Sequence, residues 1–146
     1  VVYVVLVPEN RVVVLDRATG TIGRSIPVGA GPTHLAVDEV TGHAAVVNTT
    51  GGTLSVVDGR RGTTAPPVAV GAKPYNVAVD GARGLIFVAS ATAPRLTVVD
   101  GRHGVVRGTL PLDMVPGALA IDPSHQLMIV GGANLPWVEI FSYRAL

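Results

Sequence analysis

The sequence predicts an all-β fold built from repeated four-stranded antiparallel sheets, and three observations lead to this prediction. Residues 32–58, 74–100 and 116–142 align at a constant spacing of 42 residues without a gap. Short valine-rich runs recur within each repeat, with glycine and proline between them. The three- and four-residue apolar spacing of a helical repeat does not occur. A repeat of this length made of short strands is typical of β-propeller blades.

The repeat register divides the chain into four blades, whose strands we name A to D in chain order. Residues 1–28 have room for strands B to D, 29–70 and 71–112 for all four, and 113–146 for A to C. In the two complete blades we expect strands at 33–38, 43–48, 54–58, 66–70, 75–80, 85–90, 96–100 and 106–111.

Turn signals and apolar runs support this division. The dipeptide Asp-Gly, which favours tight turns, occurs at 58–59, 80–81 and 100–101. Runs such as LIFVA at 85–89 are apolar at every position, which is typical of a sheet covered on both faces. Pro66-Pro67 falls where a strand D begins. Because proline lacks an amide donor, we expect strand D at the outer edge of each blade.

These fourteen strands are too few for a closed ring, since about 3.5 blades fall short of the four to eight that propellers use. An open arc exposes an apolar blade face at each end. We therefore expect the chain to be part of a larger, seven-bladed propeller, or to assemble with copies of itself. The predicted partners are the remainder of the propeller or a second copy of the chain.

Composition narrows the range of partners. Of the 146 residues, 48% are apolar and 14% charged, with a net charge of +1, so we expect no nucleic-acid partner. No apolar run reaches the roughly 18 residues of a membrane helix, so no membrane span is predicted. The chain has no cysteine, phosphate-binding glycine loop, haem-attachment motif or nucleophilic serine elbow. No cofactor is predicted.

Four sequence elements carry a resemblance to a known family. Pro32–Val37 reads PTHLAV, Val13–Asp16 reads VVLD before Thr19-Gly20, Ile26–Gly29 reads IPVG, and Tyr3 precedes valine. Together they resemble YVTN-type β-propeller repeats along the whole chain. The departures are Ala45 and Ile129 at the tyrosine position and Leu6, Ser90 and Gly132 at the asparagine position.

The resemblance implies a bacterial or archaeal protein, often periplasmic or exposed at the cell surface. It also implies several unrelated activities, because similar propellers include streptogramin-lyase-like, lactonase-like and redox enzymes. A propeller fold by itself therefore says little about function.

Candidate ligand-binding residues lie where the chain enters strand A. The D-to-A and B-to-C turns should share one rim of the arc, and strand A should line the central channel. The entering residues differ between blades while their neighbours stay constant: Thr33 and His34, Tyr75 and Asn76, Gly117 and Ala118. Such differences suit a binding site, although rim residues facing solvent also vary freely.

His34 is the only histidine expected on this rim, so it is the candidate for acid–base chemistry; a surface or hydrogen-bonded role is the plainer interpretation. Asp113 is the nearest carboxylate candidate on the same rim. Arg95 and Trp137 share one register at the B-to-C turn, where Trp137 could stack a flat ligand or pack on the blade edge. We predict a ligand-binding rim of His34, Tyr75, Asn76, Arg95 and Trp137.

Aspartates recur at the ends of strands A and C: Asp38, Asp80 and Asp122, and Asp16, Asp58 and Asp100. The first set could form a carboxylate ring that attracts a cation. Capping of the following turns through backbone amides is the favoured interpretation for both sets. His43, His103 and His125 belong to the opposite rim in different registers, so no metal site is predicted.

Three functions are consistent with this sequence. The first is a non-catalytic scaffold that presents variable loops to a protein or small molecule. The alternative is a segment of a streptogramin-lyase-like or lactonase-like propeller enzyme, with its site at the channel mouth near His34. The third is a structural surface-layer or adhesive module.

Overall fold

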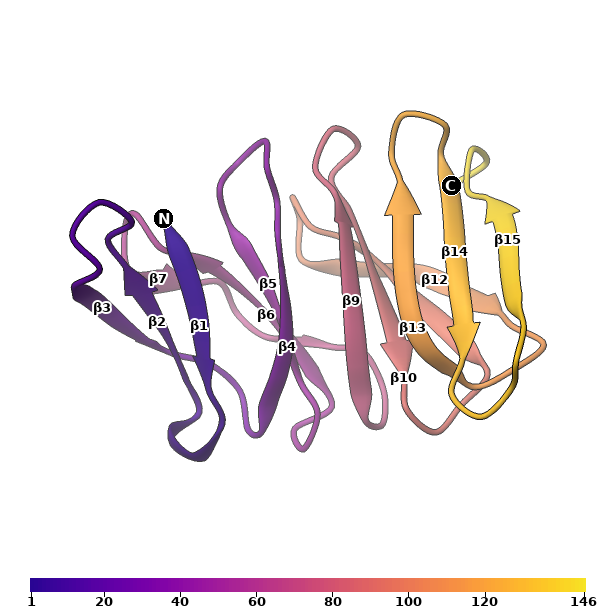
Figure 1. The fold of residues 1–146 in the computed structure, drawn as a ribbon, viewed down its shortest axis with the longest axis horizontal. Coiled ribbons are helices and arrows are strands. Elements are labelled where there is room, and N and C mark those ends of the chain that lie inside the picture. Colours follow the sequence, from indigo (N-terminus) through magenta and orange to yellow (C-terminus); the bar gives the residue numbers. More distant parts are fainter.

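The computed structural model describes all 146 residues and shows four antiparallel sheets side by side in an open arc (Figure 1). Each sheet consists of strands consecutive in the sequence, so each is a simple meander. The predicted fold class, an all-β partial β-propeller, is confirmed.

The first and second sheets contain the first eight strands and the only helix. The first has β1 (Val2–Leu6), the three-residue 3-10 helix η1 (Val7–Glu9), β2 (Arg11–Leu15) and β3 (Ile22–Pro27). The second has β4 (Pro32–Val37), β5 (Ala44–Asn48), β6 (Thr53–Asp58), β7 (Thr63–Thr64) and β8 (Val68–Ala69). The short η1 is the only helix, and no helix of this chain could cross a membrane.

The third and fourth sheets contain the remaining seven strands. The third has β9 (Pro74–Asp80), β10 (Leu85–Ser90), β11 (Arg95–Asp100) and β12 (Val105–Pro111). The fourth has β13 (Pro116–Asp122), β14 (Leu127–Gly132) and β15 (Val138–Ser142).

These strands lie close to the expected positions, with one difference. Strand D of the second sheet is split into β7 and β8, which both pair with β6, so the chain has fifteen strands instead of fourteen. Pro66 and Pro67 lie in the gap, where neither can donate an amide to the ladder. Strand D is the outermost strand of the second and third sheets, as predicted.

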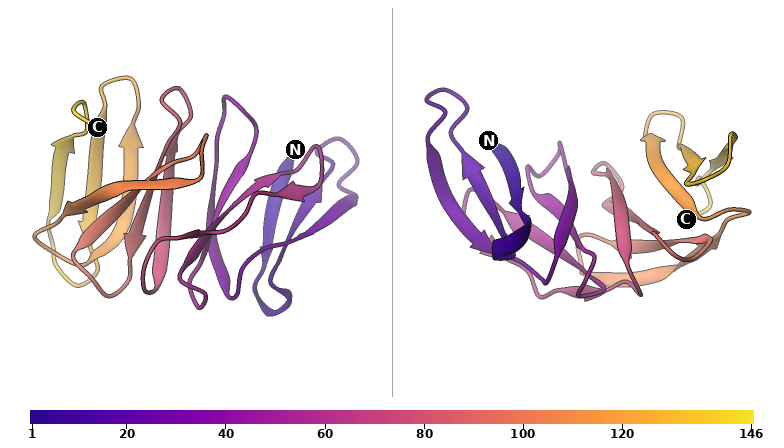
Figure 2. Two further views of the ribbon diagram at one scale, coloured as in Figure 1. Left: turned by 180° about the vertical axis from the view of Figure 1, so that it is seen from behind. Right: turned by 60° about the horizontal axis from the view of Figure 1, so that its bottom comes forward.

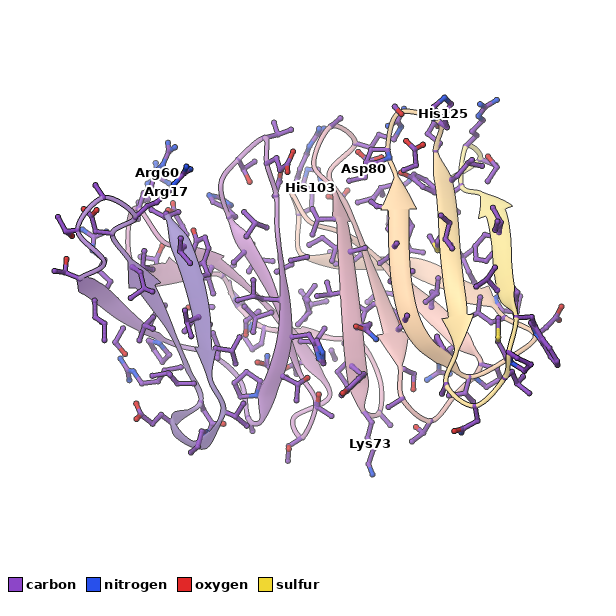
Figure 3. All side chains as sticks on the ribbon, in the orientation of Figure 1. Arg17, Arg60, Lys73, Asp80, His103 and His125 are labelled. Atoms are coloured by element: carbon purple, nitrogen blue, oxygen red, sulfur yellow. The ribbon has the colours of Figure 1, made fainter.

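The arc brings the innermost strands together on its concave side. Strands β4, β9 and β13 pack next to one another, and β12 runs along the convex side (Figure 2). The A-to-B and C-to-D turns form what we call the upper rim, with Arg17, Arg60 and His125, and the D-to-A and B-to-C turns form the lower rim, with Lys73 (Figure 3). Side chains from different blades therefore meet along β4 and β9.

The hydrophobic core consists of three clusters, one in each space between adjacent sheets. All five residues of β5 are buried because both faces of its sheet are covered. Ala44 and Val46 belong to the cluster shared with the first sheet, and Ala45 and Val47 to the cluster shared with the third. Burying each such valine contributes about 1.5–3 kcal/mol, which makes the sheets bind tightly face to face.

Candidate functional site

His34 of β4 and Tyr75 of β9 meet on the concave side near the lower rim. Their ring centroids are 4.4 Å apart and the rings are inclined at 65°, an edge-to-face contact between neighbouring blades. The Nδ1 atom of His34 is enclosed and has no hydrogen-bond partner. Tyr75 is 40% exposed, so this pair offers an aromatic surface to solvent.

Hydrogen bonds fix the strands around this pair. The Thr49 hydroxyl donates to the carbonyl of Pro74 at 2.6 Å, so Thr33, whose oxygen lies 2.6 Å from that of Thr49, is the donor in their contact. The Asn76 amide donates to the carbonyl of Gly117 at 2.8 Å. These bonds connect the second sheet to the third and the third to the fourth. We call Thr33, His34, Tyr75 and Asn76 the inner site.

Two predicted binding residues lie apart from the inner site. Arg95 is exposed at the start of β11, and its guanidinium lies beside Gly71. Trp137 is exposed just before β15. No hydrogen bond, ion pair or aromatic contact joins either residue to His34 or Tyr75. Asp113 is also separate, with its amide donating to Glu139 Oε1 at 2.9 Å.

Thr49 was missed by the sequence reasoning, although its register carried a signal. The aligned residues in the next two blades are Ala91 and Ala133, which have no hydroxyl. The aligned residue of the first blade is Val7, so a lone polar residue at an otherwise apolar position marks a contact specific to one blade.

On the upper rim the aspartates cap turns, as the favoured interpretation predicted. Each accepts backbone amides from residues two or three positions later: Asp16, Asp38, Asp58, Asp100 and Asp122 from two, and Asp80 from one. The amides of Thr19 and Ala18 lower the pKa of Asp16. Hydrogen bonds from His103 and from the amides lower the pKa of Asp100. The carboxylates are thus held in local turns.

Asp80 differs from its aligned residues because it is fully buried. Its Oδ2 accepts from Arg83 Nη1 and from the Tyr143 hydroxyl, each at 3.0 Å. Arg83 also donates to the carbonyl of Pro123 at 3.1 Å, so this network joins the third sheet to the fourth. Burial and the bond to Asp80 raise the pKa of Tyr143 to about 12.

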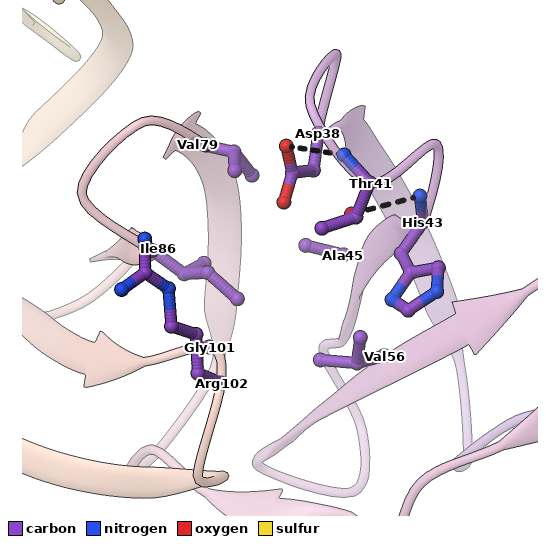
Figure 4. A pocket seen from close by; sticks show the side chains of 11 residues that line it. Asp38, Thr41, His43, Ala45, Val56, Val79, Ile86, Gly101 and Arg102 are labelled. Carbon is purple, nitrogen blue, oxygen red and sulfur yellow. Dashed lines mark hydrogen bonds between the residues drawn. The ribbon is translucent and has the colours of Figure 1, made fainter.

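The upper rim also contains a pocket of about 160 Å³ between the second and third sheets (Figure 4). Ala45, Val56, Val79 and Ile86 form its apolar walls, and Asp38, His43 and Arg102 are the charged or titratable residues that line it. Three histidines of this rim approach aspartates: His43 at 3.5 Å from Asp58, His103 at 2.9 Å from Asp100 and His125 at 2.7 Å from Asp122. No group of three or more His, Asp or Glu side chains is arranged to hold a metal ion.

Comparison with known proteins supports the fold. No family model and no curated protein matches the chain. Among solved structures, hydrazine synthase of Kuenenia stuttgartiensis has a TM-score of 0.89 and 17% identity, covering 98% of this chain and 43% of its own. The dihydro-heme d1 dehydrogenase NirN has a TM-score of 0.74, 16% identity and coverages of 94% and 31%. Apo AztD of Citrobacter koseri has a TM-score of 0.62, 19% identity and coverages of 72% and 31%.

The chain spans less than half the length of each of these structures. At such low identity the likeness concerns the fold alone, and the resemblance to YVTN-type repeats stays a prediction from the sequence. The similar structures are β-propeller proteins. This chain therefore has the fold of part of a β-propeller, with a concave inner site that crosses from one blade to the next.

Proposed function

We propose that the chain is a non-catalytic binding scaffold of a YVTN-type β-propeller and that it holds its ligand at the inner site. The observation that carries this proposal is the contact of His34 with Tyr75 across two blades. The framework around them repeats from blade to blade, whereas these two residues do not.

The inner site has the properties of a preorganised binding surface. Its strands are fixed by hydrogen bonds between blades, so little conformational entropy is lost when a ligand binds. A half-exposed tyrosine provides contact area together with a hydroxyl, a combination enriched at recognition sites. The exposed part of Tyr75 would contact the ligand, whereas the Nδ1 atom of His34 is enclosed and out of its reach. A protein loop or a small polar molecule with an apolar part fits this chemistry.

Other residues extend the proposed surface. Arg95 and Trp137 belong to B-to-C turns of the lower rim and would contact a ligand larger than the inner site. The resemblance to YVTN-type repeats supports a periplasmic or cell-surface location. Further blades, from a longer chain or a second copy, would complete the channel around the site.

The scaffold proposal is tested by screening peptides and small molecules for thermal stabilisation of the full chain, followed by calorimetric titration of the hits. We expect Tyr75→Ala to weaken binding of a true ligand about tenfold or more, because a central aromatic contact is lost. Arg60→Ala on the upper rim is the control and should leave affinity unchanged. Hits that bind Tyr75→Ala and His34→Ala as tightly as the unchanged chain contradict the proposal.

A second candidate is a segment of a propeller enzyme with His34 as acid or base. Two of the similar structures carry enzyme names, hydrazine synthase and dihydro-heme d1 dehydrogenase. The two functions differ in what happens to the bound molecule. Mass spectrometry of each hit after incubation should show it unchanged if the chain is a scaffold. Conversion by the unchanged chain that is lost in His34→Ala would replace the scaffold with the enzyme.

A further inference from the structure

The three spaces between adjacent sheets are filled differently at one register position. In the first space this position is Tyr3, whose ring is buried between the first and second sheets. Its hydroxyl donates to the carbonyl of Gly42 at 2.7 Å and accepts the amide of Gly59 at 3.0 Å. A phenol group therefore occupies the upper end of this space.

The third space is filled by two aromatic rings. The aligned residue is Phe87, and Tyr143 of the fourth sheet stands in the register of Gly59. The two ring centroids lie 4.9 Å apart, and the Tyr143 hydroxyl binds Asp80. A phenol group is again present at the upper end.

The middle space has no aromatic ring. The aligned residue is Ala45, and Gly101 faces it from the third sheet. Ile86 fills part of the volume, reaching to 2.9 Å from where a Cβ on Gly101 would lie. The amide of Gly101 donates directly to the carbonyl of Gly84 at 2.8 Å, where the first space has the Tyr3 hydroxyl inserted. The pocket of about 160 Å³ is the volume that remains (Figure 4).

We propose that this pocket binds a small free phenol, a single aromatic ring with one hydroxyl, in place of the missing side chain. The size fits, because an apolar cavity of about 150 Å³ is enough to bind benzene. The apolar residues Ala45, Val56 and Ile86 would contact the ring.

The polar residues of the pocket suit a hydroxyl rather than a charged group. Asp38 uses Oδ1 to accept the amides of Val40 and Thr41, which leaves Oδ2 without a hydrogen bond. Arg102 brings the opposite charge to the same pocket and donates to the carbonyl of Ala82. A neutral hydroxyl can donate to Asp38 Oδ2 without an uncompensated charge entering the pocket. This site lies on the upper rim and is independent of the function proposed for the inner site.

The test is titration of the full chain with p-cresol, followed by calorimetry and by NMR shifts of the Ala45 and Ile86 methyl groups. Binding with shifts at these methyls is expected, and toluene, which lacks the hydroxyl, should bind at least about fivefold more weakly. The double variant A45Y/I86A recreates the Tyr3–Ala44 pair of the first space and should weaken p-cresol binding at least about tenfold. Arg60→Ala, which changes the residue aligned with Arg102 in the filled first space, should retain the affinity of the unchanged chain.

A second variant tests the same proposal if the double variant does not fold. Ala45→Leu adds apolar volume inside the pocket and should weaken p-cresol binding at least about fivefold. The proposal is overturned if p-cresol does not bind at millimolar concentration or shifts other methyl groups instead. Equal affinity of the unchanged chain and both filled variants overturns it as well, and equal affinity for toluene overturns the assigned role of the hydroxyl.

Discussion

At the scale of single residues, the same amino acid in the same repeat register has different structural roles because its neighbours differ. Asp38 caps a turn at the surface, whereas the aligned Asp80 is buried beneath Arg83 and Tyr143. The difference arises because Tyr143 stands where the second and third blades have Gly59 and Gly101. The buried carboxylate is stable there because each of its oxygens has a hydrogen-bond donor.

Because the turn-capping aspartates are hydrogen-bonded as carboxylates, we predict that the folded chain becomes less stable in acid. Hydrogen bonds hold the pKa values of Asp16, Asp58, Asp100 and Asp122 below the ordinary value of 3.8. The unfolded chain therefore binds more protons in acid, so the free energy of unfolding should fall as pH drops below about 5. Urea unfolding at a series of pH values below and above 5 measures this decline in the free energy of unfolding. Asp100→Asn should show a shallower decline, and equal slopes in both proteins would contradict the assignment.

Tyr143→Phe should lower the free energy of unfolding by about 1–3 kcal/mol, because buried Asp80 loses one donor. The raised pKa, about 12 against an ordinary 10.0, also predicts that the unchanged chain loses stability as pH rises from 10 to 12. The variant should lack that alkaline loss. Denaturant unfolding at neutral and alkaline pH measures both effects. Tyr75→Phe, at an exposed ring, is the control. A Tyr143→Phe variant as stable as the unchanged chain would show that the bond to Asp80 does not stabilise the fold.

At the scale of elements, strand D shows how two blades can share a register and differ in continuity. The pair Leu54–Val68 aligns with Leu96–Leu110 of the third sheet, so β8 and β12 pair in the same register. Strand β12 is unbroken because Gly108 and Thr109 stand where the second sheet has two prolines. The break between β7 and β8 therefore results from the two prolines, and the order of the strands in the sheet is unchanged.

Replacing both prolines by their aligned residues should join β7 and β8 into one strand. In the variant P66G/P67T the new amide of residue 66 can pair with β6, because the aligned Gly108 lies opposite Val98 at one of the alternate positions whose amides face β11. Hydrogen exchange followed by NMR should show slowed exchange at this amide. Free exchange there, in a variant as stable as the parent, would mean that the outer edge cannot pair at this point.

At the scale of the whole molecule, the two outer faces of the arc are exposed blade faces. Val4 is 37% exposed, whereas the aligned Val46 and Val88 are 0% and 2% exposed. Ile140 is 61% exposed, whereas the aligned Val98 is 2% exposed. Only the presence of a neighbouring sheet distinguishes these positions. We therefore expect each outer face to be covered by a further blade, from a longer chain or from a second copy.

This chain should self-associate through its outer faces when it is prepared alone. Ile140→Lys places a charge on one face and should shift the mass in solution toward the monomer, because a buried charge without a partner is unfavourable. Light scattering over a concentration series measures the mass. Val40→Lys, also exposed but on the upper rim, should leave association unchanged. A monomeric parent chain at high concentration would contradict the expectation.

The sequence alone determined the fold and much of its detail. The 42-residue register, the prolines before strand A and the aspartates at the turns locate the strands and the caps. These features are local, because turn chemistry and strand periodicity act over a few residues. The same reasoning placed His34 and Tyr75 on one rim.

Only the tertiary structure decided which of these residues meet. His34 and Tyr75 are 41 positions apart and touch because β4 and β9 pack side by side, whereas Arg95 and Trp137 remain apart. The burial of Asp80 and the pocket beside Ala45 likewise depend on what the next sheet contributes to a shared space. Such contacts depend on packing between blades, which the pattern within one repeat does not contain.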